Sequence, residues 1–187
     1  MNDRPLRADA RRNRDRLLEV AVRAFAADDP GVSLEAIARA AGVGIGTLYR
    51  HFPTREALVE AAYRSELDRL CEAAPELLKG RPADVALRTW MDHFVDYMTT
   101  KRGMAEALRA VIASGGNPYA HSRDRLLTAI GQLLEAGATA GTVRADADPA
   151  DVLSALNGVT LAVPEPAQRD RAGRLLDLLM DGLRFRR

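Results

Sequence analysis

Apolar residues recur at steps of three and four positions along most of the chain, which is the period of an amphipathic α-helix. The first stripe consists of Leu18, Ala21, Val22 and Phe25, and it ends before the turn-forming residues 28–31. The alternation of apolar and polar residues that marks a β-strand is almost absent. The pattern therefore predicts an all-α protein.

The same spacing predicts further helices, which are separated by glycine, proline and polar residues. Pro53 disfavours helical geometry in the residue before it, so a short helix must stop at Phe52, and Pro75 is expected to end or kink the next helix. We expect about nine helices in total. After the first stripe they cover residues 34–41, 45–52, 55–74, 82–100, 104–113, 121–139, 149–163 and 166–184.

Residues 33–58 have the spacing of a helix-turn-helix motif. Ser33 precedes an apolar run and can cap its helix, and Gly42 supplies the left-handed residue that ends that helix. A second helix begins within residues 44–47, only a turn's length later. Thr54 then caps a third helix, whose first position is Arg55.

The charges in this motif favour a polyanionic partner. No acidic residue lies between Glu35 and Glu56, although acids are frequent elsewhere in the chain. Solvated charges on an ordinary helical hairpin would explain the basic residues but not the missing acids, so nucleic acid is the simplest partner. The basic residues in this interval are Arg39, Arg50, His51 and Arg55.

Gly46 and Arg55 support the same interpretation. A glycine in the opening turn of a helix costs about 1 kcal/mol relative to alanine, and it is expected where a backbone must come close to another molecule. Arg55 places a cation at a helix N-terminus, where the helix dipole is already positive. A bound anion would resolve that conflict.

Composition limits the other classes of function. The 187 residues carry a net charge of +1, and Cys71 is the only cysteine, so neither an intrachain disulfide nor a cysteine-based zinc site is possible. No apolar run approaches the roughly 20 residues that span a membrane. His93 and His121 lack the spacing of a metal site. We expect a cytoplasmic protein without a cofactor, a metal ion, catalytic residues or membrane contact.

The segment VGIGTLYRHFPTREAL resembles the DNA-binding half of the TetR family of bacterial transcriptional regulators, and the likeness extends from about Arg12 to Leu58. The resemblance implies that Ile45, Gly46 and Thr47 meet base edges. It also implies phosphate contacts from Tyr49, His51 and Arg55, with Ser33 as a candidate for a further one. The complete set of candidate DNA-binding residues is Ser33, Gly44, Ile45, Gly46, Thr47, Tyr49, Arg50, His51 and Arg55.

The chain departs from the family pattern at two positions of this motif. Gly44 stands where a polar or charged residue is common, and Glu35 stands where some relatives use a base-reading cation. We therefore expect few direct hydrogen bonds to base edges. Ile45 is suited to contact a thymine methyl group, and Thr47 a methyl group or a polar base edge.

The resemblance also implies a division into domains. We expect a flexible arm over residues 1–10, a helix-turn-helix DNA-binding domain over 11–58, and a ligand-binding and dimerisation domain over 59–187. The arginine-rich start, with Arg11 and Arg14 among its basic residues, is either solvated and disordered or placed against phosphates or in a minor groove. The sequence leaves both alternatives open.

In the second domain, aromatic residues and methionines mark the best candidates for an apolar effector pocket, because methionine adapts to varied shapes. These candidates are Trp90, Met91, Phe94, Met98, Met104, Leu108, Ile112, Tyr119 and Leu127. In the family the last two helices form the dimer interface as a four-helix bundle. The apolar stripes expected there are Val152, Leu156, Val159, Val163, Leu175, Leu176, Leu179 and Leu183.

The resulting hypothesis is a homodimeric regulator that binds double-stranded DNA and is released from a near-palindromic operator by a small-molecule effector. A repressor is expected. The alternatives are a TetR-like activator, a helical-bundle enzyme with an apolar cavity, and an architectural DNA-binding protein without a sensor. The enzyme would need a convergent acid, base or metal set, which the sequence lacks.

Overall fold

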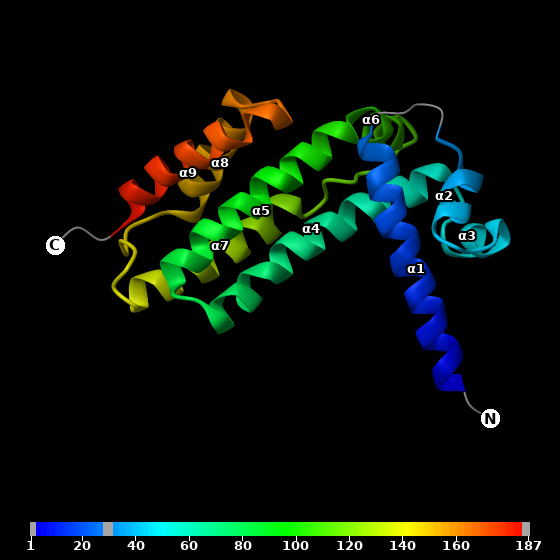
Figure 1. The fold of residues 1–187 in the computed structure, drawn as a ribbon, viewed down its shortest axis with the longest axis horizontal. Coiled ribbons are helices and arrows are strands. Elements are labelled where there is room, and N and C mark those ends of the chain that lie inside the picture. Colours follow the sequence, from blue (N-terminus) through cyan, green and yellow to red (C-terminus); the bar gives the residue numbers. More distant parts are fainter. Residues whose placement is uncertain (1–2, 28–31, 185–187) are drawn as a thin grey trace. The chain divides into compact units, whose positions relative to one another are not determined.

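The computed structural model describes residues 3–27 and 32–184, and within this part of the chain the fold is all-α (Figure 1). One isolated bridge, between Val143 and Arg184, is the only β-type pairing in these residues. The elements are α1 (Asp3–Ala26), α2 (Leu34–Ala40), α3 (Ile45–His51), α4 (Arg55–Gly80), α5 (Ala83–Gly103), α6 (Ala105–Ala113), α7 (Ser122–Thr139), α8 (Pro149–Ala162), the 3-10 helix η1 (Pro166–Gln168) and α9 (Arg169–Leu183). The all-α prediction is confirmed.

The chain forms two compact units, and each combines segments that are distant in the sequence. Unit 1 contains Met1–Glu66 and Thr100–Pro118, and unit 2 contains Leu67–Thr99 and Tyr119–Arg187. Helices α4 and α5 each contribute residues to both units. The third segment of the helix-turn-helix region is therefore the first part of a helix that continues into the second unit.

In unit 1, helices α1, α2 and α3 and the first part of α4 bury apolar side chains. Leu17 of α1, Leu48 of α3 and Leu58 of α4 are fully buried, as the three- and four-residue spacing of their helices requires. Phe25 and Ile37 are also buried in this unit. The stripes that predicted these helices are thus the faces that pack.

The first helix is longer than the apolar stripe indicated. We expected a flexible arm over residues 1–10, but α1 already begins at Asp3. Pro5 is compatible with this start because it lies in the first helical turn, where backbone amide groups have no partner within the helix. Residues 1–2 of the expected arm lie outside the described part of the chain.

Helix α4 passes through Pro75 and ends at Gly80, so the predicted end near Ala74 was wrong. Pro75 is exposed, and its missing amide hydrogen removes one backbone bond, to the carbonyl of Cys71. Buried residues of this helix, Leu70 and Ala74 among them, hold it together by packing. Tertiary contacts here outweigh the local preference of proline.

Unit 2 has a core built on α5. The indole of Trp90 is fully buried and donates a hydrogen bond to the carbonyl of Leu70, at 2.8 Å, so its polar atom is satisfied. The ring of Phe94 lies 5.9 Å from that of Trp90 and 6.2 Å from that of Tyr97. This aromatic row fills the interior of the helical unit.

Ion pairs join α5 to α9 within unit 2. The guanidinium of Arg88 contacts Asp92 at 2.5 Å and Asp177 at 2.7 Å, while Arg169 contacts Asp92 at 2.9 Å and Asp96 at 3.1 Å. These groups are partly exposed, so each pair contributes little by itself, but the shared carboxylate of Asp92 fixes the register of the two helices.

Among the described residues, no helix is long and apolar enough to cross a membrane. The same residues contain no group of three or more histidine, cysteine or carboxylate side chains placed to hold a metal ion.

The end of α5 meets the end of α1 at Gly103. A Cβ atom at this position would lie 2.9 Å from Cα and from the carbonyl carbon of Ala26, and closer still to its carbonyl oxygen. Glycine is therefore required at position 103 by the close approach of two backbones within unit 1.

Lys101 lies two residues before Gly103, and its burial lowers the pKa of its amine. That amine lies 6.0 Å from the ring centroid of Tyr63.

We predict that Gly103→Ala lowers the free energy of unfolding by about 1–3 kcal/mol, because the two backbones must separate to admit the methyl group. Urea denaturation monitored by circular dichroism measures this change. Gly80→Ala is the control, since nothing lies within 4 Å of a Cβ atom there. Equal stability of the Gly103→Ala variant and the wild type would show that this contact does not constrain the unit.

Candidate nucleic-acid interface

The turn between α2 and α3 is held by backbone hydrogen bonds. Gly42 has a φ of +67°, the left-handed conformation expected from the sequence. The amide of Gly42 donates to the carbonyl of Arg39, and that of Val43 donates to Ala38, both at 3.0 Å. This pair of bonds is a Schellman motif, which ends α2 and directs the chain into α3.

Helix α3 is anchored on one face and open on the other. Leu48 is fully buried, and Phe52, which follows the helix, is 3% exposed. Ile45 and Tyr49 lie beside this anchor on the helix and are 36% and 46% exposed. These are large side chains that an isolated protomer leaves in water, so the outer face of α3 is available to a partner.

Gly44 and Gly46 are not required by the protein's own packing. Neither has a φ in the left-handed region, and a Cβ atom added at either position would have nothing within 4 Å. An alanine would therefore fit at both positions, and at Gly46 it would favour the helix, whereas Gly44 is the N-cap residue, where glycine is preferred to alanine. The absence of side chains instead leaves the backbone at the start of α3 open to close approach from outside.

Arg50 folds back along α3. Its Nε atom donates to the carbonyl of Gly46 at 3.2 Å, and one terminal nitrogen donates to the hydroxyl of Thr47 at 2.9 Å. The Thr47 hydroxyl accepts this bond and retains its own hydrogen for a further acceptor. A base edge or a phosphate can therefore bind Thr47 without displacing Arg50.

Ser33 and Thr54 cap the helices that flank α3. The hydroxyl of Ser33 accepts a hydrogen bond from the amide of Ala36, and that of Thr54 accepts one from the amide of Ala57, both at 3.1 Å. Both caps were predicted from the sequence. Each hydroxyl still has its own hydrogen to donate, so the cap and the predicted phosphate contact of Ser33 are compatible.

Arg55 is the candidate whose contacts differ most from the expectation. Its guanidinium donates to the carbonyl of Val32 and lies 5.0 Å from the centroid of the Phe25 ring. The cation at the positive end of α4 is thus stabilised within the protomer, by a carbonyl and an aromatic face, without an added anion. The side chain connects α1, the segment before α2 and α4.

The remaining side chains complete a basic surface. Helix α3 has no acid in its first turn and ends with Arg50 and His51. The His51 ring is half-buried and lies 6.1 Å from that of Phe52. Arg14 of α1 also reaches this region, with its guanidinium 5.7 Å from the Phe52 centroid. Sequence periodicity did not predict this last contact, because it joins segments that are distant in the chain.

The nine effector-pocket candidates do not form one class in the structure. Trp90, Met91, Phe94, Met104 and Leu108 are fully buried, Met98 and Leu127 are half-buried, and Ile112 and Tyr119 are exposed. Met104, Leu108 and Ile112 belong to unit 1, and the other six belong to unit 2. Their assignment to an effector site stays a prediction.

The stripes expected at the dimer interface lie mostly within their own protomer. Val152, Leu156, Val163, Leu176 and Leu183 are buried, while Val159, Leu175 and Leu179 are not fully buried. The large apolar side chains that α8 and α9 expose most are different ones, Leu161 at 78% and Leu178 at 68%. A single stripe of apolar spacing cannot distinguish the side of a helix that packs internally from an adjacent side that meets a second copy.

Two family models match the chain. Residues 17–62 match the model of the N-terminal region described as bacterial regulatory proteins of the tetR family. Residues 82–185 match the model described as the C-terminal domain of SbtR-like transcriptional regulators. The first match covers the helix-turn-helix, and the second covers more than half of the whole chain.

Solved structures with similar sequences agree with these matches. A TetR transcriptional regulator from Streptomyces coelicolor is 54% identical, with a TM-score of 0.87 over 91% of this chain and 98% of that one. A TetR transcription regulatory protein from Mycobacterium vanbaalenii is 38% identical, with a TM-score of 0.79 over 97% and 100% of the two chains.

Curated relatives resemble about a third of the chain. HTH-type transcriptional regulators from Staphylococcus aureus are 41% identical over 66 residues, which are 34% of this chain. The matched region spans 35% of the length of those relatives.

The contacts of Arg55 generate a prediction. We expect Arg55→Ala to lower the free energy of unfolding by about 1–2 kcal/mol, because it removes a charged hydrogen bond and a cation–π contact. Chemical denaturation measures the change. Arg64→Ala is the matched control on the same helix, since Arg64 makes a surface ion pair with Glu60 and should contribute less than about 1 kcal/mol. Unchanged stability of Arg55→Ala, together with weaker DNA binding, would instead support a role as a phosphate ligand only.

Proposed function

We propose, from the premise that this chain belongs to the TetR family of bacterial DNA-binding transcriptional regulators, that it represses a promoter until a small molecule releases it. Members of this family are regulators and not enzymes, so the chain has no catalytic site to assign. The repressed promoter lies in the bacterial cytoplasm, where we place the activity.

One observation carries the proposal: the outer face of α3 is exposed, free of carboxylates and opened by two glycines. An α-helix fits the major groove of B-DNA, where Ile45 can contact a thymine methyl group and Thr47 a methyl group or a polar edge. In this proposal Tyr49 and His51, which belong to the same short helix, contact phosphates, which fix the register on the duplex.

Dimerisation sets the form of the operator in this proposal. Two copies of α3 related by a two-fold axis enter successive major grooves about 34 Å apart, so the operator is a near-palindrome. The exposed Leu161 of α8 and Leu178 of α9 supply apolar surface for a four-helix interface between protomers.

Release by an effector requires that the ligand prefer one conformation of the protein. Helix α4 begins in unit 1 and continues into unit 2, so it joins the DNA-binding helices covalently to the helices that carry most of the effector candidates. In one conformation of the dimer the two copies of α3 are not spaced to enter successive major grooves. A small molecule that binds better to this conformation shifts the population away from the DNA-binding conformation. The apolar and aromatic candidates favour an apolar or aromatic effector.

The experiment that tests this proposal follows the chain's own promoter. A promoter reporter in a deletion strain should show higher expression, and a gel shift with the upstream DNA should show a complex that a cell extract or a screened small molecule dissolves. Lower expression after deletion would identify an activator instead. A complex that no metabolite affects would identify a DNA-binding protein without a sensor.

We predict that the double variant Leu161→Glu, Leu178→Glu is monomeric. Two buried leucines each contribute about 1.5–3 kcal/mol of transfer free energy, and a carboxylate at their positions adds a desolvation cost. Sedimentation velocity at micromolar concentration measures the change, and DNA affinity should fall with it because one half-site is no longer bound.

The control for this prediction is Val85→Glu on α5, which replaces another apolar side chain, one that is 44% exposed. This variant should sediment as the wild type does. If the leucine double variant also kept the sedimentation coefficient of the wild type, α8 and α9 would not be the dimer interface.

A further inference from the structure

Helix α1 carries a stripe whose chemistry changes halfway along its length. The face that packs in unit 1 includes Leu18, Ala21 and Phe25, which are spaced by three and four residues. Towards the N-terminus the same spacing continues, but every position is now an arginine. The arginine stripe consists of Arg14 and Arg11, and the sequence continues this register with arginines at positions 7 and 4.

Arg14 shows where the change occurs. Its guanidinium lies 5.7 Å from the centroid of Phe52, the residue that follows α3, and Phe52 is buried. The arginine stripe therefore begins beside the C-terminal end of α3. The apolar residues of α1 pack in the core of unit 1. The arginine positions lie in the part of α1 that is N-terminal to this core contact.

The stripe continues beyond the other helices of unit 1. The N-terminal turns of α1 extend past α2 and α3 (Figure 1), and Arg11 is exposed. With a rise of 1.5 Å per residue, Arg14 and Arg11 lie about 4.5 Å apart along the helix axis. Duplex DNA carries one phosphate charge per about 1.7 Å of its axis, so the two guanidinium groups can contact neighbouring phosphates.

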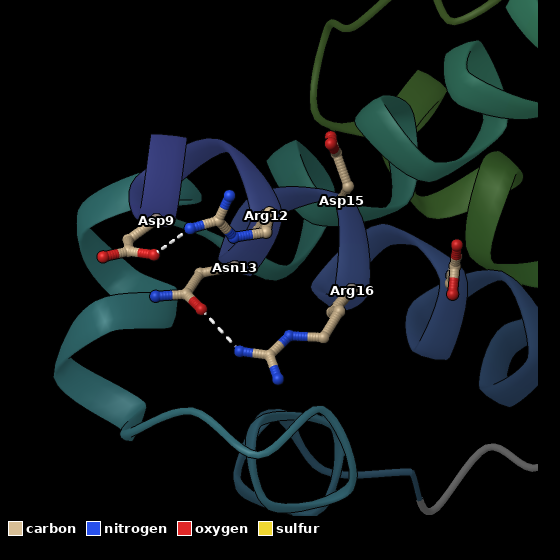
Figure 2. A pocket seen from close by; sticks show the side chains of 6 residues that line it. Asp9, Arg12, Asn13, Asp15 and Arg16 are labelled. Atoms are coloured by element: carbon tan, nitrogen blue, oxygen red, sulfur yellow. Dashed lines mark hydrogen bonds and ion pairs between the residues drawn. The ribbon is translucent and has the colours of Figure 1, made fainter. Parts of the chain in front are cut away.

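The opposite face of α1 has a different charge balance. Arg12 forms an ion pair with Asp9, and Arg16 donates to the side-chain oxygen of Asn13 at 2.6 Å (Figure 2). Asp15 and Glu19 line the same hollow. Acidic and basic groups are mixed there, as on a solvated surface, and Asp15, four residues after Arg11, lies at the border with the arginine stripe.

We propose that the arginine stripe binds the phosphate backbone of DNA next to the half-site that α3 reads, and so lengthens the operator that each protomer covers. The stripe adjoins the reading helix and is complementary in charge to DNA. It precedes residues 17–62, which match the family model, so the proposal concerns a feature outside that region. This inference rests on DNA binding by α3.

The test compares two double variants that remove the same charge from opposite faces of α1. These are Arg11→Gln, Arg14→Gln on the stripe and Arg12→Gln, Arg23→Gln on the other face. Arg16 is kept because its guanidinium lies 4.0 Å from the Cβ position of Gly42 in the helix-turn-helix. Fluorescence anisotropy with a long duplex of mixed sequence, over a range of salt concentrations, gives the slope of log K against log salt. The magnitude of that slope should fall by about 0.9 for each phosphate that the protein no longer neutralises.

We expect the stripe variant to reduce both slope and affinity, the opposite-face variant to keep both, and Arg11→Lys, Arg14→Lys to restore both because it keeps the charges. Arg11→Gln alone serves if removing the Arg14 guanidinium from Phe52 impairs folding. Equal reductions from both faces would overturn the proposal, because they indicate only long-range attraction, and so would no reduction from either. If the wild type itself ignored duplex DNA at low salt, the proposed function would fail with it.

Discussion

The burial of Leu48 is the interaction on which the DNA-binding surface depends. Helix α3 has seven residues, and a helix this short is not stable in water by itself. Packing of Leu48 in the core of unit 1 therefore both holds the helix and decides which of its sides is exposed. Ile45 and Tyr49 lie beside that anchor and are exposed, and the left-handed turn at Gly42 brings the helix to the place where the anchor can be buried.

Near the buried Leu48, basic residues contact the protein core and also contribute positive charge to the DNA-binding surface. Arg14 and Arg55 each lie over a buried aromatic ring, Phe52 and Phe25 respectively. Their charged groups are therefore placed by the core of unit 1 and not by solvent. Arg50, in contrast, lies along its own helix and leaves the hydroxyl of Thr47 a hydrogen to donate. A surface that must fit a fixed array of phosphates gains from side chains that are ordered before binding.

Local chemistry made the helix-turn-helix predictable from the sequence. A capping hydroxyl, a left-handed glycine and a proline each act within a few residues, so the ends of α2 and α3 followed directly. The predicted end of α4 was wrong because packing between distant residues carries the helix through Pro75. The contacts of Arg55 with Val32 and Phe25 could not be predicted from local chemistry, because these partners are far away in the chain. For the same reason, spacing alone did not identify Leu161 and Leu178 as the exposed leucines of the last two helices.

The central claim, that the outer face of α3 lies in a major groove, is tested most directly by dimethyl sulfate footprinting on the promoter DNA, because this reagent modifies guanine at N7 in that groove. The account predicts two patches of protected guanines about 34 Å apart along the duplex, with Ile45 and Thr47 at their centres. A complex that forms but leaves every guanine N7 reactive would contradict it.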